Sequence, residues 1–111
     1  MREHRDIIVI GTVQGIGFRA SAKNQADRLS ITGFVMNCQD GSVCIEAEGE
    51  QVNCDAFAHW CCDGPPEARV EHITNVQGEL KGYTTFEIRR GHVMCLVQII
   101  YKNPKPWYSY E

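Results

Sequence analysis

The stretch IIVIGTVQGIGFRASAK, residues 7–23, passes from aliphatic residues through a glycine-rich turn into a helical pattern. The run Ile7–Ile10 is apolar at every position, which is typical of a central strand covered on both faces. Beyond the turn, Ala22, Ala26 and Leu29 recur with helical spacing. This stretch therefore predicts a strand, a turn and a helix with a small-residue face.

Alternating patterns in the rest of the chain predict further strands. The segment GFVMNCQDGSVCIEAEG, residues 33–49, is typical of a hairpin with its turn at Asp40-Gly41. In its second strand Glu46 and Glu48 alternate with apolar residues, which predicts one solvent-exposed face. The other expected elements are a helix from about Gln51 to Cys62, an irregular strand near 68–76, and a strand in GYTTFEIRR, residues 82–90.

The order β-α-β-β-α-β-β predicts an α+β ferredoxin-like sandwich, an antiparallel sheet with both helices on one face. A chain of 111 residues is long enough for one ordinary core and too short for two domains. In this topology the first two strands run parallel with one strand between them, so their C-terminal ends lie about 10 Å apart. Arg19 and Asn37 are therefore expected to reach one small ligand.

Composition disfavours several classes of partner. The 11 basic and 14 acidic residues give a net charge of -3, and no basic block favours a nucleic acid or an anionic membrane. The polar N-terminus shows no signal-peptide pattern, so we expect a cytoplasmic protein. Without secretion signals we expect reduced thiols, and because no cysteine pair has the C-x-x-C spacing we expect no metal. The cysteines are Cys38, Cys44, Cys54, Cys61, Cys62 and Cys95.

The turn between the first strand and the first helix has the composition of an anion site. Gly15 and Gly17 permit positive φ angles, and the following helix adds unpaired N–H donors and a positive dipole end. Arg19 adds a planar, permanently charged group that matches phosphate oxygens. The turn alone is equally compatible with a tight turn beside a surface arginine.

Residues 15–20 also satisfy the loose G-x-G-x-x-A dinucleotide pattern, with Asp40 at the distance of an acidic ribose ligand. Asp40 is better explained by the hairpin turn, and the next strand begins where a Rossmann unit requires another crossover helix. The chain is also too short for a doubly wound six-stranded sheet. We therefore disfavour a dinucleotide site.

These motifs together resemble the acylphosphatase family. VQGIGFR is similar to its phosphate-binding signature and ITGFVMNCQDGSV to its second signature, and AEG, FAHW, DGPPEARV and YTTFEIRR follow in order over about residues 7–90. The resemblance implies hydrolysis of acyl phosphates to a carboxylate and inorganic phosphate, without metal or cofactor. It also implies that Asn37 orients the attacking water. The groups it implies for phosphoryl binding are the Arg19 side chain and the backbone N–H groups of Gln14, Gly15, Ile16, Gly17, Phe18 and Arg19.

The chain departs from the family pattern at several positions. Ser30 and Phe34 stand where many relatives have Gly and Trp, and Met36 stands where Arg or Gln is common. Residues 1–90 are expected to form the acylphosphatase-like domain, with 91–111 as a C-terminal extension. Its apolar part is expected to pair with a sheet edge, within the chain or in a homodimer. A phosphate-binding module without turnover and an interaction domain that uses the extension remain alternatives.

Overall fold

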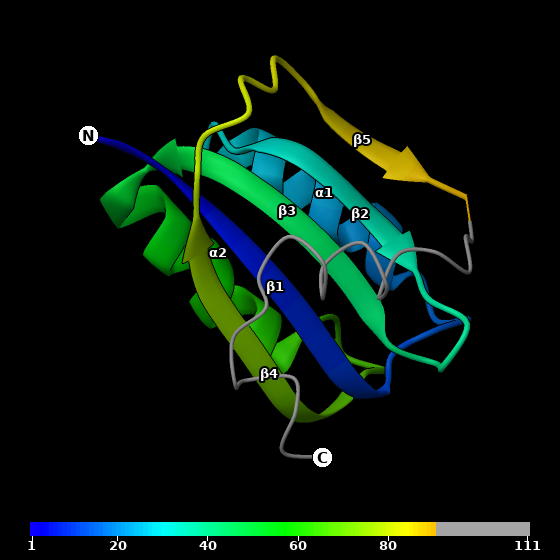
Figure 1. Ribbon diagram of the computed structural model, residues 1–111. Helices are drawn as coiled ribbons and strands as arrows, with labels where there is room; N and C mark the ends of the chain where they lie inside the picture. The colour runs from blue at the N-terminus through cyan, green and yellow to red at the C-terminus, as the bar shows by residue number, and fades with distance from the viewer. Residues whose placement is uncertain (91–111) are drawn as a thin grey trace.

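The computed structural model of the chain describes residues 1–90, which form a five-stranded sheet and two helices (Figure 1). The elements are β1 (Arg2–Thr12), α1 (Phe18–Arg28), β2 (Thr32–Asn37), β3 (Val43–Glu50), α2 (Gln51–Asp63), β4 (Arg69–Gly78) and β5 (Phe86–Arg89). This order confirms the predicted β-α-β-β-α-β-β arrangement. The strand expected after residue 91, and the homodimer built on it, lie outside the described residues. No helix within residues 1–90 has the length and apolar character needed to cross a membrane.

The strands lie in the order β4-β1-β3-β2-β5. The pairs β4·β1, β1·β3 and β3·β2 are antiparallel, as predicted, whereas β2 and β5 are parallel. The expectation of a wholly antiparallel sheet was therefore wrong for its last pair. The reason is that residues 79–85 carry the chain from β4 across the face without helices to the opposite edge, where β5 begins beside the start of β2 (Figure 1).

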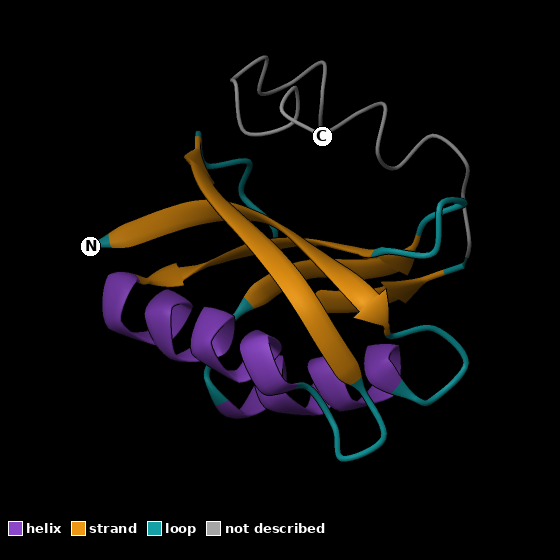
Figure 2. Cartoon of the chain, turned by 90° about the horizontal axis from the view of Figure 1, so that it is seen from below, coloured by secondary structure: helices purple, strands orange, loops and turns teal. Residues whose placement is uncertain are grey.

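Both helices cover one face of the sheet, as predicted (Figure 2). The core between them is built from fully buried strand residues such as Ile7 and Ile45, which are partners in the β1–β3 register. Ala22 and Ala26 are completely buried on α1, so the small-residue face lets this helix lie close to the sheet. Phe57 provides a large apolar side chain from α2. Burial of side chains of this size typically contributes about 1.5–3 kcal/mol each.

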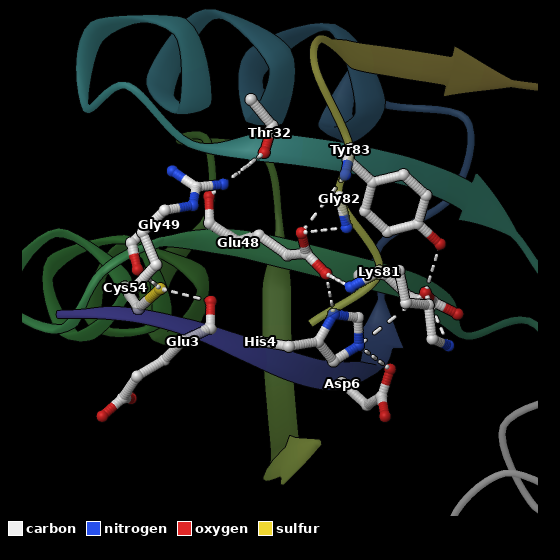
Figure 3. A network of polar contacts seen from close by, with 12 residues as sticks. Glu3, His4, Asp6, Thr32, Glu48, Gly49, Cys54, Lys81, Gly82 and Tyr83 are labelled. Atoms are coloured by element: carbon white, nitrogen blue, oxygen red, sulfur yellow. Dashed lines mark hydrogen bonds and ion pairs between the residues drawn. The ribbon is translucent and has the colours of Figure 1, made fainter. Parts of the chain in front are cut away.

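The prediction of a wet face on β3 was wrong. Glu46 and Glu48 are only 1% and 0% exposed, because residues 81–83 contact both carboxylates on the face without helices. Figure 3 shows this segment beside Glu48. The Glu48 carboxylate accepts the backbone N–H groups of Lys81, Gly82 and Tyr83 at 2.6–3.2 Å. These bonds satisfy a buried charge that sequence alternation alone assigns to solvent.

Candidate active site

The turn between β1 and α1 adopts the backbone conformation that its glycines permit. Gly15 and Gly17 have φ angles of 77° and 81°, in the left-handed region. A Cβ atom added at either glycine would meet no heavy atom within 4 Å, so open space lies beside both residues. Gly17 is the N-cap of α1 and offers no side chain to the first-turn N–H groups. These donors are therefore arranged for an anion.

A cavity of about 250 Å³ lies at this turn. Its described lining is Val13, Gly15, Gly17, Phe18, Arg19, Ala20, Asn37, Ile88 and Arg90. The cavity confirms that the chain brings Arg19 and Asn37 to one place, as the parallel arrangement of β1 and β2 predicts. No carboxylate appears among these lining residues, so the site favours an anionic ligand.

The two other residues of the glycine loop, which we define as residues 14–19, have side chains outside this lining. Ile16 packs against the hydrophobic core. The Gln14 amide donates from Nε2 to the backbone carbonyls of Cys38, at 2.7 Å, and Ser42, at 2.8 Å. Gln14 thus links the glycine loop to the hairpin that carries Asn37. Sequence reasoning missed this link, because nothing in the local sequence indicates which carbonyls a loop amide will reach.

Arg19 lies in the first turn of α1 and reaches across to the end of β5. Its Nη1 donates to the backbone carbonyl of Arg89 at 3.3 Å. Among the described residues this is the one hydrogen bond of the Arg19 side chain, and a guanidinium carries five N–H donors. The contact holds the guanidinium near the cavity while four donors stay available for a ligand.

Asn37 is the last residue of β2 and pairs with Val43 of β3. Its side chain lines the cavity and makes no hydrogen bond to other residues within 1–90. The amide is therefore not used to fix the end of the strand. It can accept from, and donate to, a water molecule or a substrate oxygen.

A disulfide joins Cys38, which directly follows Asn37, to Cys44 of β3. Cys44 pairs with Met36, so Cys38 is its diagonal neighbour across the hairpin, and the two Cα atoms are 6.5 Å apart. The expectation of reduced thiols was wrong for this pair, because hairpin register brings together cysteines whose spacing matches no common motif. The described free cysteines are Cys54, Cys61 and Cys62.

The described residues contain one group with metal-ligand spacing, His4, Asp6 and Glu46. These residues alternate with the helix-side core residues Ile7 and Ile45, so they lie on the sheet face without helices. The His4 ring is hydrogen-bonded at both nitrogens, from Nδ1 to Glu48 at 2.7 Å and from Nε2 to Asp6 at 3.0 Å. Burial alone lowers the pKa of His4, but these hydrogen bonds outweigh it and raise the pKa above its ordinary value. Because both ring nitrogens are already engaged by carboxylates, neither is left for a metal, and the group forms an internal hydrogen-bond network.

Comparisons with known proteins agree with this geometry. The family description "Acylphosphatase" matches residues 5–88. A curated acylphosphatase from Nocardioides sp. is 42% identical over 89 residues, covering 80% of this chain and 90% of the relative. The crystal structure of acylphosphatase from Bacillus subtilis has a TM-score of 0.76 at 37% identity and covers 80% of this chain and 99% of the other. An acylphosphatase from Coxiella burnetii has a TM-score of 0.77 at 32% identity, covering 79% and 93%. The chain therefore belongs to the acylphosphatase family and is an enzyme that hydrolyses acyl phosphates.

Proposed function

We propose that Arg19 and the backbone N–H groups of the glycine loop bind the phosphoryl group of the acyl phosphate, and that Asn37 orients the attacking water. The observation that supports this assignment is that Gly15, Gly17, Arg19 and Asn37 line one and the same cavity. Its loop offers N–H donors without side-chain partners, and its arginine offers a planar cation. The amide of Asn37 lines the same cavity.

These groups suffice for the reaction because little bond-making chemistry falls to the protein. The attacking water oxygen forms a bond to phosphorus as the bond to the carboxylate oxygen breaks. The leaving carboxylate is already a stable anion, so no strong acid is required to protonate it. The proton of the water passes to a phosphoryl oxygen of the substrate. Positioning and charge stabilisation then account for most of the acceleration.

The two side chains are distinguished by steady-state kinetics with acetyl phosphate and by inhibition with inorganic phosphate. Arg19→Lys keeps the positive charge but loses the planar pair of donors, so we expect weak phosphate inhibition and a severe loss of kcat/KM. Asn37→Ala removes one preorganised polar group, so we expect kcat to fall by about 10²-fold or more. The inhibition constant of phosphate should change little in Asn37→Ala. Circular dichroism checks that both variants fold.

Gln25→Ala is the matched control for Asn37→Ala, since it removes an amide from α1 outside the cavity lining and should retain parental kinetics. Equal losses of phosphate affinity and turnover in Asn37→Ala would assign Asn37 to substrate binding instead. Near-parental activity of Arg19→Lys would contradict the role of the planar guanidinium.

A further inference from the structure

We propose that Arg90 supplies a second guanidinium for the phosphoryl group, so that the site is built for a phosphoryl dianion. This inference rests on the proposed function, because it uses the same cavity. Arg90 is exposed, directly follows β5, and lines the cavity together with Arg19 and Asn37.

The parallel pairing of β2 and β5 places Arg90 beside Asn37. The last printed pairs are Val35 with Ile88 and Met36 with Arg89, so Asn37 and Arg90 directly follow the final pair, and both line the cavity. Neighbouring strands are about 4.8 Å apart, and paired residues point to the same face. Val35 and Ile88 both pack in the core under the helices. Because side chains alternate, the residues two positions later face the helix side as well.

The side chains of the consecutive residues Arg89 and Arg90 therefore lie on opposite faces of the sheet. The Arg89 guanidinium carbon lies 4.0 Å from the centroid of the Phe34 ring, and its Nε pairs with Glu87 at 3.3 Å. Phe34 belongs to the cluster on the face without helices. Arg90 instead enters the cavity lining. The Arg89 carbonyl, which belongs to the peptide group joining Arg89 and Arg90, accepts the Nη1 donor of Arg19. This contact holds Arg19 against the backbone that leads into Arg90.

The charge of the lining matches a dianion. Arg19 and Arg90 are the charged residues among its described members, and each guanidinium carries one positive charge at all ordinary pH values. A phosphoryl group with one esterified oxygen carries close to two negative charges at pH 7. Two guanidinium groups beside one phosphoryl group can each donate to different oxygens. Because both guanidinium groups bind the phosphoryl group, the cavity can bind substrates whether the acyl group is charged or neutral.

The experiment compares the parent, Arg90→Gln and Arg28→Gln. Arg28→Gln removes the same charge at the far end of α1, about 14 Å along the helix from Arg19, and lies outside the cavity lining. Two measurements are made: the Kd of inorganic phosphate by isothermal titration calorimetry, and KM for acetyl phosphate, with a neutral acyl group, and succinyl phosphate, with an anionic one. Arg90→Lys is included to test whether charge alone suffices.

We expect Arg90→Gln to raise the phosphate Kd and both KM values by a common factor of about 10 to 100, the range for one charge-assisted hydrogen bond. Arg90→Lys should recover part of the loss, and Arg28→Gln should change each value less than about twofold. A loss confined to succinyl phosphate would assign Arg90 to the acyl group and overturn the proposal. Unchanged values in Arg90→Gln would overturn it as well.

The calorimetric measurement separates this proposal from the assignment of Arg19 and Asn37. If Arg19→Lys and Asn37→Ala retained parental turnover, that assignment would fail. A weakened phosphate Kd in Arg90→Gln would still support a second guanidinium at the anion site. A parental phosphate Kd in Arg90→Gln would overturn the Arg90 proposal whatever the kinetics of the other variants.

Discussion

At the scale of single residues, the end of α1 shows how a residue other than glycine is accommodated in the left-handed conformation. Ser30 is expected to be glycine in many relatives. Its φ angle is 58°, and among residues 1–90 it is the residue other than glycine that has a positive φ. The Ile31 N–H bonds to the Ala26 carbonyl at 2.8 Å, and the Ser30 N–H bonds to the Asp27 carbonyl at 3.3 Å. This is the Schellman arrangement, which ends a helix with one left-handed residue. Ser30 therefore bears a conformational cost that glycine avoids.

We predict that Ser30→Gly raises the free energy of unfolding by up to about 1 kcal/mol. The left-handed conformation costs an ordinary L-residue about 1–2 kcal/mol, and the greater freedom of glycine in the unfolded chain offsets part of that gain. Urea unfolding followed by circular dichroism measures the change. Ser21→Gly, inside α1, is the control and should destabilise by about 0.5–1 kcal/mol. A destabilised Ser30→Gly variant would contradict this account.

At the scale of elements, the crossover from β4 to β5 is fixed to the sheet by carboxylates of β3. Glu48 accepts three backbone N–H groups of this crossover, and Glu46 accepts the Tyr83 hydroxyl at 2.5 Å. Lys81 Nζ lies 3.3 Å from the same Glu46 oxygen. The position of the crossover is therefore fixed by the buried acceptors that lie beneath it. The fixed crossover places β5 at the edge of the sheet beside β2. There Arg90 lines the cavity and the Arg89 carbonyl accepts a hydrogen bond from Arg19.

We predict that Tyr83→Phe lowers the free energy of unfolding by about 1–3 kcal/mol, because it deprives a buried carboxylate of a donor. The double-mutant cycle with Glu46→Gln is the control, since it isolates the interaction of the pair from the effects of each change alone. Chemical denaturation of the four proteins gives the coupling energy. A coupling energy near zero would show that the hydroxyl contributes nothing through Glu46.

At the scale of the whole molecule, the two faces of the sheet are stabilised by different forces. The face under the helices buries an apolar core (Figure 2). The other face carries the charged network of His4, Asp6, Glu46 and Glu48, with Lys81 and Tyr83 packed above it (Figure 3). The network on the second face contains groups whose pKa values shift on folding, so it makes the stability of the protein depend on pH.

We predict that stability is highest between about pH 4.5 and 6.5. The pKa of His4 is raised above 6.5, so its contribution is complete below that pH and is lost as pH rises through the folded pKa. Burial opposes ionisation of Glu48, but backbone hydrogen bonds from Lys81 and Tyr83 and the bond to His4 lower its pKa below 4.5. Its contribution is complete above pH 4.5 and is lost as pH falls through the folded pKa.

Urea unfolding of the parent between pH 4 and 9 measures this dependence. His4→Gln should have a lower free energy of unfolding than the parent at pH 6. Between pH 6.5 and 9 its free energy of unfolding should fall much less than that of the parent. His59→Gln, at an exposed position on α2, should keep the parental profile. A parental free energy of unfolding that stays constant from pH 6 to 9 would contradict the role assigned to His4.

The sequence by itself determined the order of elements, the glycine turn and the meeting of Arg19 with Asn37. These features depend on hydrophobic periodicity, on turn residues and on the rule that the ends of two parallel strands share one edge, all of which are local or topological. Resemblance to known motifs supplied the reaction. The disulfide between Cys38 and Cys44 could not be predicted from these patterns, because it depends on the register of the hairpin.

Only the tertiary structure decided what covers each surface and which distant groups meet. Alternation in β3 marks two faces but cannot show that residues 81–83 will cover Glu46 and Glu48 and supply their donors. The parallel β2–β5 pair, the link from Gln14 to the hairpin and the arrival of Arg90 at the cavity likewise join segments far apart in the chain. Burial and hydrogen bonding of this kind are set by long-range packing, which the residues next to a position in the sequence do not indicate.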